Sequence, residues 1–194
     1  QRFICASNSN NVLTDFISTG VYDRNRPFYL TTSPSMDILI SSNLERLLYM
    51  ECGDSDEVKG YMASLSREGR YQVSDALRAA IQARFDCGFA DDAMAADTIK
   101  KVFADKGYLA DPHTAVAINV YEAYKARTGD DTPTVIASTA SPFKFPLSVL
   151  KALDADCSGE EFDLLDRVSK ISGLDAPAAL ASLKNAKERF TGSI

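Results

Sequence analysis

Short apolar runs alternate with polar, helix-like stretches along this chain. The runs at 3–6, 85–90 and 134–138 each lead into a polar turn and then into a segment with helical spacing of its apolar residues. This repeated order is typical of α/β domains, because parallel strands are joined by helical crossovers. The sequence therefore predicts an α/β fold: an open parallel sheet flanked by helices, with these three runs as parallel strands. A short run at 28–30 is interpreted as an edge strand.

Local helix signals fix the expected boundaries of several helices. A helix is expected from Val12 to Ser18 after an Asn-rich turn, and another follows Asp91 and Asp92 and ends before Gly107. Three local signals support these boundaries: a side chain that accepts hydrogen bonds from the first turn, a proline at the first position, and a glycine after the last turn. Further helices are expected at 57–67, 75–84, 112–128, 161–171 and 177–190. We therefore divide the chain into residues 1–150, which contain the sheet, and a helical tail, residues 151–194, packed on it.

The stretch 31–48, TTSPSMDILISSNLERLL, carries more small polar groups than a helix start requires. Ser33 is interpreted as the N-cap of a helix, with Pro34 at its first position and Asp37 in its first turn. Leu44, Leu47 and Leu48 mark the buried face of that segment. The surplus polar residues are Ser41, Ser42, Asn43 and Arg46. They make this stretch a candidate binding site, although a surface ion pair is the ordinary alternative for Arg46.

Neutral polar residues follow two of the predicted strands. Ser7, Asn8 and Asn10 follow the first, and residues 138–141, Ser-Thr-Ala-Ser, follow the third. In open α/β sheets, ligands bind beyond the carboxyl ends of the strands. Taken singly, the cap-plus-proline pairs at 33–34, 111–112 and 141–142 are explained by helix initiation alone. Together these residues predict a polar, largely uncharged ligand edge.

Composition and charge exclude some classes of function. The chain has 194 residues, 45% hydrophobic and 25% charged, with net charge -6 and a pI near 4.8. An acidic chain is a poor non-specific binder of nucleic acid, and no apolar run approaches the roughly 18 residues of a membrane span. We expect neither nucleic acid nor a membrane as partner. Gln1 followed at once by a core strand indicates a piece of a longer chain.

Few residues suited to catalysis stand out. The four cysteines, at 5, 52, 87 and 157, match no zinc spacing and are expected to be free thiols, which favours a reducing, cytoplasmic setting. His113 is the single histidine and stands at a helix start, where a structural role is the more common one. The sequence contains no phosphate-binding glycine motif and no metal-ligand cluster, so no metal site is expected.

A series of motifs along the chain carries a resemblance. A strand runs into an Asn-rich turn at 2–16, RFICASNSNNVLTDF, and TGVY follows at 19–22. SPSMDI and SSNLERLL come next at 33–38 and 41–48, and then DPHTAV at 111–116 and TASPFKF at 139–145. In this order and approximate spacing, residues 2–150 resemble threonine synthases of the fungal and bacterial type. Residues 1–150 would then be the C-terminal part of a catalytic region that binds pyridoxal phosphate, within a fold-type II enzyme.

The resemblance implies an activity and a set of site residues. The family converts O-phospho-L-homoserine and water to L-threonine and phosphate, with pyridoxal phosphate held as a Schiff base on a lysine and acting as electron sink. It implies that Thr139 hydrogen-bonds the pyridine nitrogen and that His113 and Thr114 lie beside the cofactor. Candidates for the substrate pocket are Asn8, Asn10, Ser42, Asn43, Arg46 and Lys144, of which Arg46 or Lys144 would attract the substrate's carboxylate or phosphate.

The resemblance also shows what these residues lack. The family's Schiff-base lysine and its glycine-rich phosphate loop belong to the N-terminal half, which would be this chain's partner, so we expect no catalytic residue and no activity in this chain alone. Ser141 stands where members often have histidine. Two alternatives stay open: an independent, non-catalytic ligand-binding or interaction domain, and a fragment of another fold-type II pyridoxal-phosphate lyase.

Overall fold

Two short pairs of strands organise the computed structural model, which describes residues 2–187, 189 and 192. β1 (Phe3–Ser7) and β4 (Phe85–Phe89) are parallel, with Cys5 opposite Cys87. β2 (Val21–Asp23) and β3 (Arg70–Gln72) are antiparallel, with Tyr22 opposite Tyr71. The α/β prediction is confirmed, with a small parallel sheet as its centre.

Helices begin and end where local chemistry places them. The α-helices are α1 (Val12–Thr19), α2 (Leu44–Cys52), α3 (Ser55–Glu68), α4 (Asp75–Arg84), α5 (Asp92–Lys106), α6 (Pro112–Thr128), α7 (Pro146–Ala152), α8 (Glu161–Ser172) and α9 (Ala178–Ala181). Single 3-10 turns form at Pro34–Met36, Pro142–Lys144 and Ser182–Asn185. Asp91 and Asp111 cap α5 and α6 as expected, and Gly107 and Gly129 end them in the left-handed conformation.

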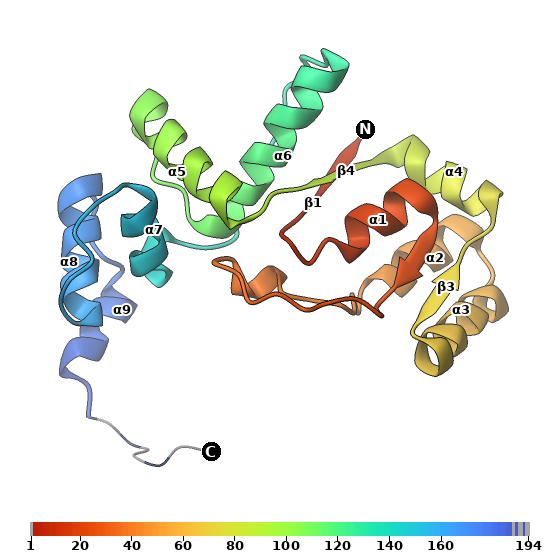
Figure 1. Cartoon of the computed structure of the whole chain (residues 1–194), viewed down its shortest axis with the longest axis horizontal. Coiled ribbons are helices and arrows are strands. Elements are labelled where there is room, and N and C mark those ends of the chain that lie inside the picture. Colours follow the sequence, from red (N-terminus) through yellow and green to blue (C-terminus); the bar gives the residue numbers. More distant parts are fainter. Residues whose placement is uncertain (1, 188, 190–191, 193–194) are drawn as a thin grey trace.

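The β1–β4 pair lies between two hydrophobic cores (Figure 1). One core joins α1–α4 with β2 and β3 and includes Phe16, Tyr22 and Tyr71. The other joins α5–α8 and includes Val116 and Leu150. Side chains alternate along a strand, so Cys5 and Cys87 pack on the first core while Ala6 packs on the second. The sheet therefore fixes where the two halves meet.

The described part of the tail contains α8, α9 and the 3-10 turn Ser182–Asn185, joined by irregular segments. Leu164, Leu165 and Val168 of α8 are buried in the same core as Val149 and Leu150 of α7. The helix predicted at 177–190 is shorter than expected, because α9 ends at Ala181 and a 3-10 turn then runs to Asn185. Phe190, the predicted end, lies outside the described residues. Among the helices of the described residues, none is both long and apolar enough to cross a membrane.

Two predicted strands are wrong, and the helix predicted to start after Ser33 is a single 3-10 turn, Pro34–Met36. Residues 134–138 form no strand in the described chain, and Val135 is 95% exposed. Residues 28–30 form an exposed loop. Only one 3-10 turn follows Ser33, whose side chain caps nothing, and α2 begins later, at Leu44. An apolar segment forms a strand only when a neighbouring strand supplies hydrogen bonds to its backbone. In the described chain, residues 134–138 have no such neighbouring strand.

Candidate functional site

The carboxyl end of β1 leads into a buried cluster of polar side chains. Asn8 is 1% exposed, and its Nδ2 lies 2.7 Å from Asp37 Oδ1, 2.8 Å from Thr31 Oγ1 and 3.1 Å from Ser33 Oγ. Its Oδ1 accepts from the backbone N–H of Asn10 at 2.9 Å. These bonds use both ends of the Asn8 amide, so Asn8 shapes the turn and keeps no polar atom free for a ligand.

Asn10 holds the next loop as a neighbouring strand would. Its Oδ1 accepts from the Tyr29 N–H at 2.9 Å, and its Nδ2 donates to the Tyr29 carbonyl at 2.8 Å and to Asp37 Oδ1 at 3.0 Å. One side-chain amide therefore satisfies both backbone groups of an exposed loop residue. Asn10, like Asn8, would act on a pocket by fixing its wall.

Asp37 is the centre of this group of residues, the Asp37 cluster, and sequence reasoning missed its role. Its carboxylate accepts from Asn8 and Asn10, from the Thr31 N–H at 3.0 Å and from the Thr31 hydroxyl at 2.7 Å. The sequence pattern predicts Asp37 in the first turn of a helix, where the helix dipole favours a carboxylate. Instead its bonds tie residues 31–37 to the turn that follows β1, and only the single 3-10 turn Pro34–Met36 forms there.

His113 joins this loop to α6. The Ser35 backbone N–H donates to Nε2 of His113 at 3.2 Å, and Nδ1 lies 2.9 Å from Asp111 Oδ1. Because a backbone N–H can only donate, Nε2 must be the acceptor, so Nδ1 carries the hydrogen and donates to Asp111. The imidazole is neutral in this arrangement, is 5% exposed and lies 4.8 Å from the ring of Phe145. Both nitrogens are occupied, which suits a positioning role.

The start of α6 also meets the segment that contains Thr139. The Thr114 hydroxyl donates to the Asp111 carboxylate and lies 3.2 Å from the hydroxyl of Ser138, which is also 3.1 Å from the Tyr108 hydroxyl. Thr139 itself is exposed, and no hydrogen bond within the described residues uses its hydroxyl. The structure thus gathers a row of neutral hydroxyls and leaves that of Thr139 to the solvent.

The remaining candidates divide between two places. Lys144 is exposed, and its Nζ lies 5.9 Å from the ring of Phe145, which contacts His113. Three candidates are exposed at the start of α2: Ser42, Asn43 and Arg46. Within the described residues they make no hydrogen bond to the Asp37 cluster or to His113. Arg46 instead borders a cavity of about 360 Å³ between α2 and α3. Lys144 borders a different hollow, of about 360 Å³, which Leu147 of α7 and Glu161 of α8 also line.

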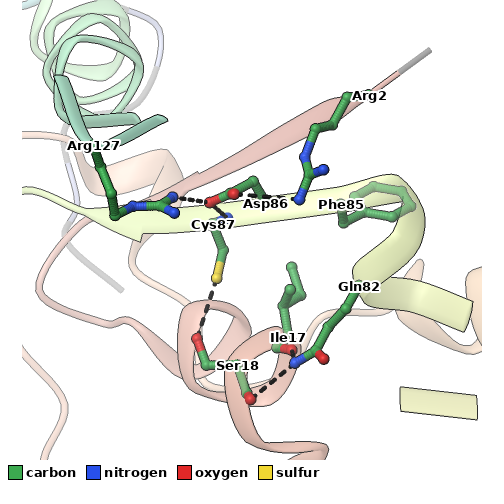
Figure 2. Close-up of a pocket in the computed structure, with 8 residues that line it drawn as sticks. All are labelled: Arg2, Ile17, Ser18, Gln82, Phe85, Asp86, Cys87 and Arg127. Atoms are coloured by element: carbon green, nitrogen blue, oxygen red, sulfur yellow. Dashed lines mark hydrogen bonds and ion pairs between the residues drawn. The ribbon is translucent and has the colours of Figure 1, made fainter. Parts of the chain in front are cut away.

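A second hollow lies at the opposite end of the strands (Figure 2). There Asp86 lies between Arg127, at 2.7 Å, and Arg2, at 3.4 Å, and Cys87 Sγ is 3.3 Å from the hydroxyl of Ser18. Burial raises the pKa of the Cys87 thiol, and that of Cys5 rises to about 11, so both stay protonated and weakly nucleophilic. All four cysteines are free, as expected. This hollow is no catalytic thiol site.

No cluster in the described residues suits a metal ion. What the carboxyl end offers instead is a group of neutral hydroxyls beside a buried imidazole. These hydroxyls can donate a hydrogen bond to an uncharged ligand or accept one from it.

The model of the family described as threonine synthase, C-terminal, matches residues 114–193. Threonine synthase of Saccharomyces cerevisiae is 33% identical over 191 residues, covering 90% of this chain and 37% of the yeast protein. Human threonine synthase-like 1 is 39% identical over 155 residues, covering 79% of this chain and 20% of the human protein.

Solved structures agree with these sequence relatives. The crystal structure of threonine synthase from Brucella melitensis with bound pyridoxal phosphate is 36% identical, has a TM-score of 0.79, and is matched over 98% of this chain and 37% of its own. The yeast enzyme has a TM-score of 0.82 at 29% identity, with 96% of this chain and 38% of its own covered. The chain thus spans between a fifth and two fifths of the relatives it matches.

Proposed function

Since this chain belongs to the threonine synthase family and corresponds to the C-terminal portion of its members, we propose that its parent polypeptide is a threonine synthase. The parent would convert O-phospho-L-homoserine and water to L-threonine and phosphate in amino-acid biosynthesis, as a carbon–oxygen lyase that depends on pyridoxal phosphate. The Schiff-base lysine and the phosphate loop would come from the part outside these residues. This chain alone would be inactive.

One observation carries the proposal: the start of α6 and the residues before the Pro142–Lys144 turn, 24 positions apart, meet at the hydroxyls of Thr114 and Ser138. These segments hold the DPHTAV and TASPFKF motifs, and the hydroxyl of Thr139 beside the contact is exposed. A pyridine nitrogen needs one neutral hydrogen-bonding partner, and this edge supplies it. The residues present therefore fit the ring side of pyridoxal phosphate.

The role proposed for each residue follows from which of its polar atoms are free to bind the cofactor. Thr139 would hydrogen-bond the pyridine nitrogen and, being neutral, leave it largely unprotonated. Pyridoxal phosphate supplies an electron sink for the reacting carbon atoms when it is bound. His113 would hold the 34–36 turn and α6 in register beside the ring, since both of its nitrogens already have partners. Thr114 would orient Ser138 and so the start of residues 139–145.

A basic residue is needed near an anionic substrate. Lys144 and Arg46 are the two candidates, and each borders a hollow of its own, while Phe145, the neighbour of Lys144, contacts His113. Asn8 and Asn10 would shape the pocket through Asp37, and Ser42 and Asn43 stay candidates for contact with the substrate. A lysine ammonium can pair with a phosphate or carboxylate as a point charge. Free cysteines support a reducing, cytoplasmic setting.

The role of Thr139 is tested in the full-length parent. Thr139→Val removes one hydrogen bond to the ring at nearly constant volume, which costs on the order of 1–3 kcal/mol in the transition state, or about ten- to a hundredfold in kcat. Thr139→Ser keeps the hydroxyl and is expected to stay near wild-type turnover. A Val variant with unchanged turnover would exclude the ring-nitrogen role.

The parent's activity is tested directly. One relative, human threonine synthase-like 1, is 39% identical to this chain, and its name states a likeness to threonine synthase, so family membership alone does not assign the reaction. Phosphate release from O-phosphohomoserine, measured with the purified parent, decides it. Release coupled to threonine supports the synthase. A parent that binds pyridoxal phosphate and releases no phosphate contradicts it.

A further inference from the structure

Three tyrosine rings are stacked where β2 and β3 meet α3. Tyr71 of β3 lies in the middle, with its ring centroid 5.3 Å from that of Tyr22 on β2 and 5.3 Å from that of Tyr61 on α3. The Tyr22 hydroxyl accepts from the Ser41 backbone N–H at 2.8 Å, and the Tyr61 hydroxyl donates to the carboxylate of Glu57. The two outer hydroxyls of the stack therefore have protein partners.

The middle hydroxyl has no partner. Tyr71 is only 4% exposed, yet no hydrogen bond within the described residues uses its hydroxyl. Every fully buried side-chain polar atom of the described residues does have a partner, so the Tyr71 oxygen is not sealed in and borders open space. Tyr22 and Tyr71 are cross-strand partners with rings only 1° from parallel, so both rings leave the sheet from the same face. Burial raises the pKa of Tyr71, which keeps this hydroxyl neutral and able both to donate and to accept.

The open space is a hollow of about 210 Å³ that Tyr71 lines, which we call the Tyr71 hollow. Aliphatic side chains of α2 and α3 supply its apolar walls: Leu44, Met62 and Leu65. Ser42 and Glu45 are its polar members at the start of α2. Since one water takes about 30 Å³ in the liquid, the hollow has room for about seven groups of that size. It can therefore hold a short-chain organic molecule.

The charge of the hollow limits what it can bind. Among the described residues that line it, Glu45 is the one charged side chain, and none is basic. Glu45 is exposed and forms no ion pair within the described residues. It also borders the neighbouring cavity that Arg46 lines, but Arg46 does not line the Tyr71 hollow. An unpaired carboxylate repels an anion and attracts an ammonium group, to which it can accept charge-assisted hydrogen bonds.

We propose that the Tyr71 hollow binds a short-chain amino alcohol, that is, a protonated primary amine joined to a hydroxyl by a few methylene groups. The ammonium group pairs with Glu45, the methylene groups pack on the aliphatic walls, and the ligand's hydroxyl bonds that of Tyr71. The site also gives a role to Ser41 and Ser42, which line the hollow and which a helix start does not require. This inference goes beyond the proposed function and does not depend on it.

The experiment titrates the full-length parent with three matched probes at neutral pH and follows the backbone amides of Ser41, Ser42 and Glu45 by NMR. 4-Amino-1-butanol should give saturable shifts. Butylamine lacks the hydroxyl and should bind about fivefold more weakly, since one neutral hydrogen bond is lost. 4-Hydroxybutanoate keeps the hydroxyl but reverses the charge and should give no shift. Equal binding of the anion, equal binding of butylamine, or no shift with any probe overturns the proposal.

Variants assign the two polar contacts. Tyr71→Phe keeps the stacked ring and removes the hydroxyl, so it should weaken the amino alcohol about fivefold and leave butylamine unchanged. Tyr49→Phe makes the same change on an exposed position of α2 that does not line the hollow, and should alter neither affinity. Glu45→Gln should weaken both amines at least about tenfold, because a charge-assisted bond is lost.

Two results with these variants contradict the proposal. If Tyr71→Phe weakens both amines equally, the hydroxyl supports the fold and does not bind the ligand. If Glu45→Gln changes neither affinity, the carboxylate does not hold the ammonium group. Threonine formation is assayed separately, so a parent that makes no threonine but binds the amino alcohol disproves the proposed function alone.

Discussion

The two nitrogens of His113 bind groups that are 76 residues apart in the chain. Ser35 is held through Nε2, and Asp111 through Nδ1. A neutral imidazole is needed for this, because a protonated Nε2 would face the Ser35 N–H with a second donor. The lone histidine is thus a structural bridge beside a candidate site, which combines the two alternatives that sequence reasoning weighs against each other.

This bridge can be tested with two substitutions. His113→Leu keeps an apolar side chain against Phe145 but leaves the Ser35 N–H without its acceptor and removes one donor to Asp111, which keeps the Thr114 hydroxyl, at a cost of about 1–3 kcal/mol. His113→Gln offers an amide oxygen where Nε2 lies. Amide exchange at Ser35, followed by NMR, should speed up strongly in the Leu variant and much less in the Gln variant. Equal exchange in both would show that Nε2 does not hold the turn.

At the scale of elements, two adjacent carboxylates at the start of α5 have different tasks. Asp91 accepts from the Met94 N–H at 2.8 Å and caps the helix. Asp92 accepts from the Thr32 backbone at 3.1 Å and from its hydroxyl at 2.9 Å, and so ties the 31–37 loop to α5. The same pair of letters in the sequence predicts only a helix start.

Alanine at each position separates these tasks. Asp91→Ala should lower the free energy of unfolding by about 1 kcal/mol through loss of the cap. Asp92→Ala should lower it less, because Asp92 is only half-buried, yet it should speed amide exchange at Thr32. Urea unfolding and NMR exchange give the two readouts. If Asp91→Ala also mobilises Thr32, the two carboxylates act as one unit.

The sequence predicts those features that depend on neighbours in the chain. The start of α6 at Pro112 and its end at Gly129 follow from an Asp-Pro cap and a left-handed glycine. The Asp37 cluster depends on partners 27 and 29 residues away. The surplus of small polar residues in 31–48 is the one local feature of the sequence that points to it. Residues 134–138 have the composition of a strand, but pairing depends on what lies beside them. The position of Thr139 next to α6 came from the family motifs.

On the scale of the whole molecule, the described chain brings two cores together at a narrow sheet (Figure 1). The polar edge at the carboxyl ends of β1 and β4 lies where these cores meet. Asn8 directly follows β1, and Asp92, at the start of α5, follows β4 and binds Thr32. Contacts across it are made by single hydrogen bonds such as those of His113. The geometry of the edge therefore depends on how firmly the two halves are held together.

This dependence predicts how the 194-residue chain behaves with pyridoxal phosphate. It offers hydroxyls for the ring but no phosphate loop, and phosphate contacts supply much of the affinity for such a ligand. Binding should be weak, with no shift of the cofactor's absorbance, and borohydride treatment should leave its lysines unmodified. Mass spectrometry after reduction gives the answer, with the full-length parent as the positive control. A yellow chain with one lysine modified stoichiometrically would mean that a complete cofactor site is present in these residues.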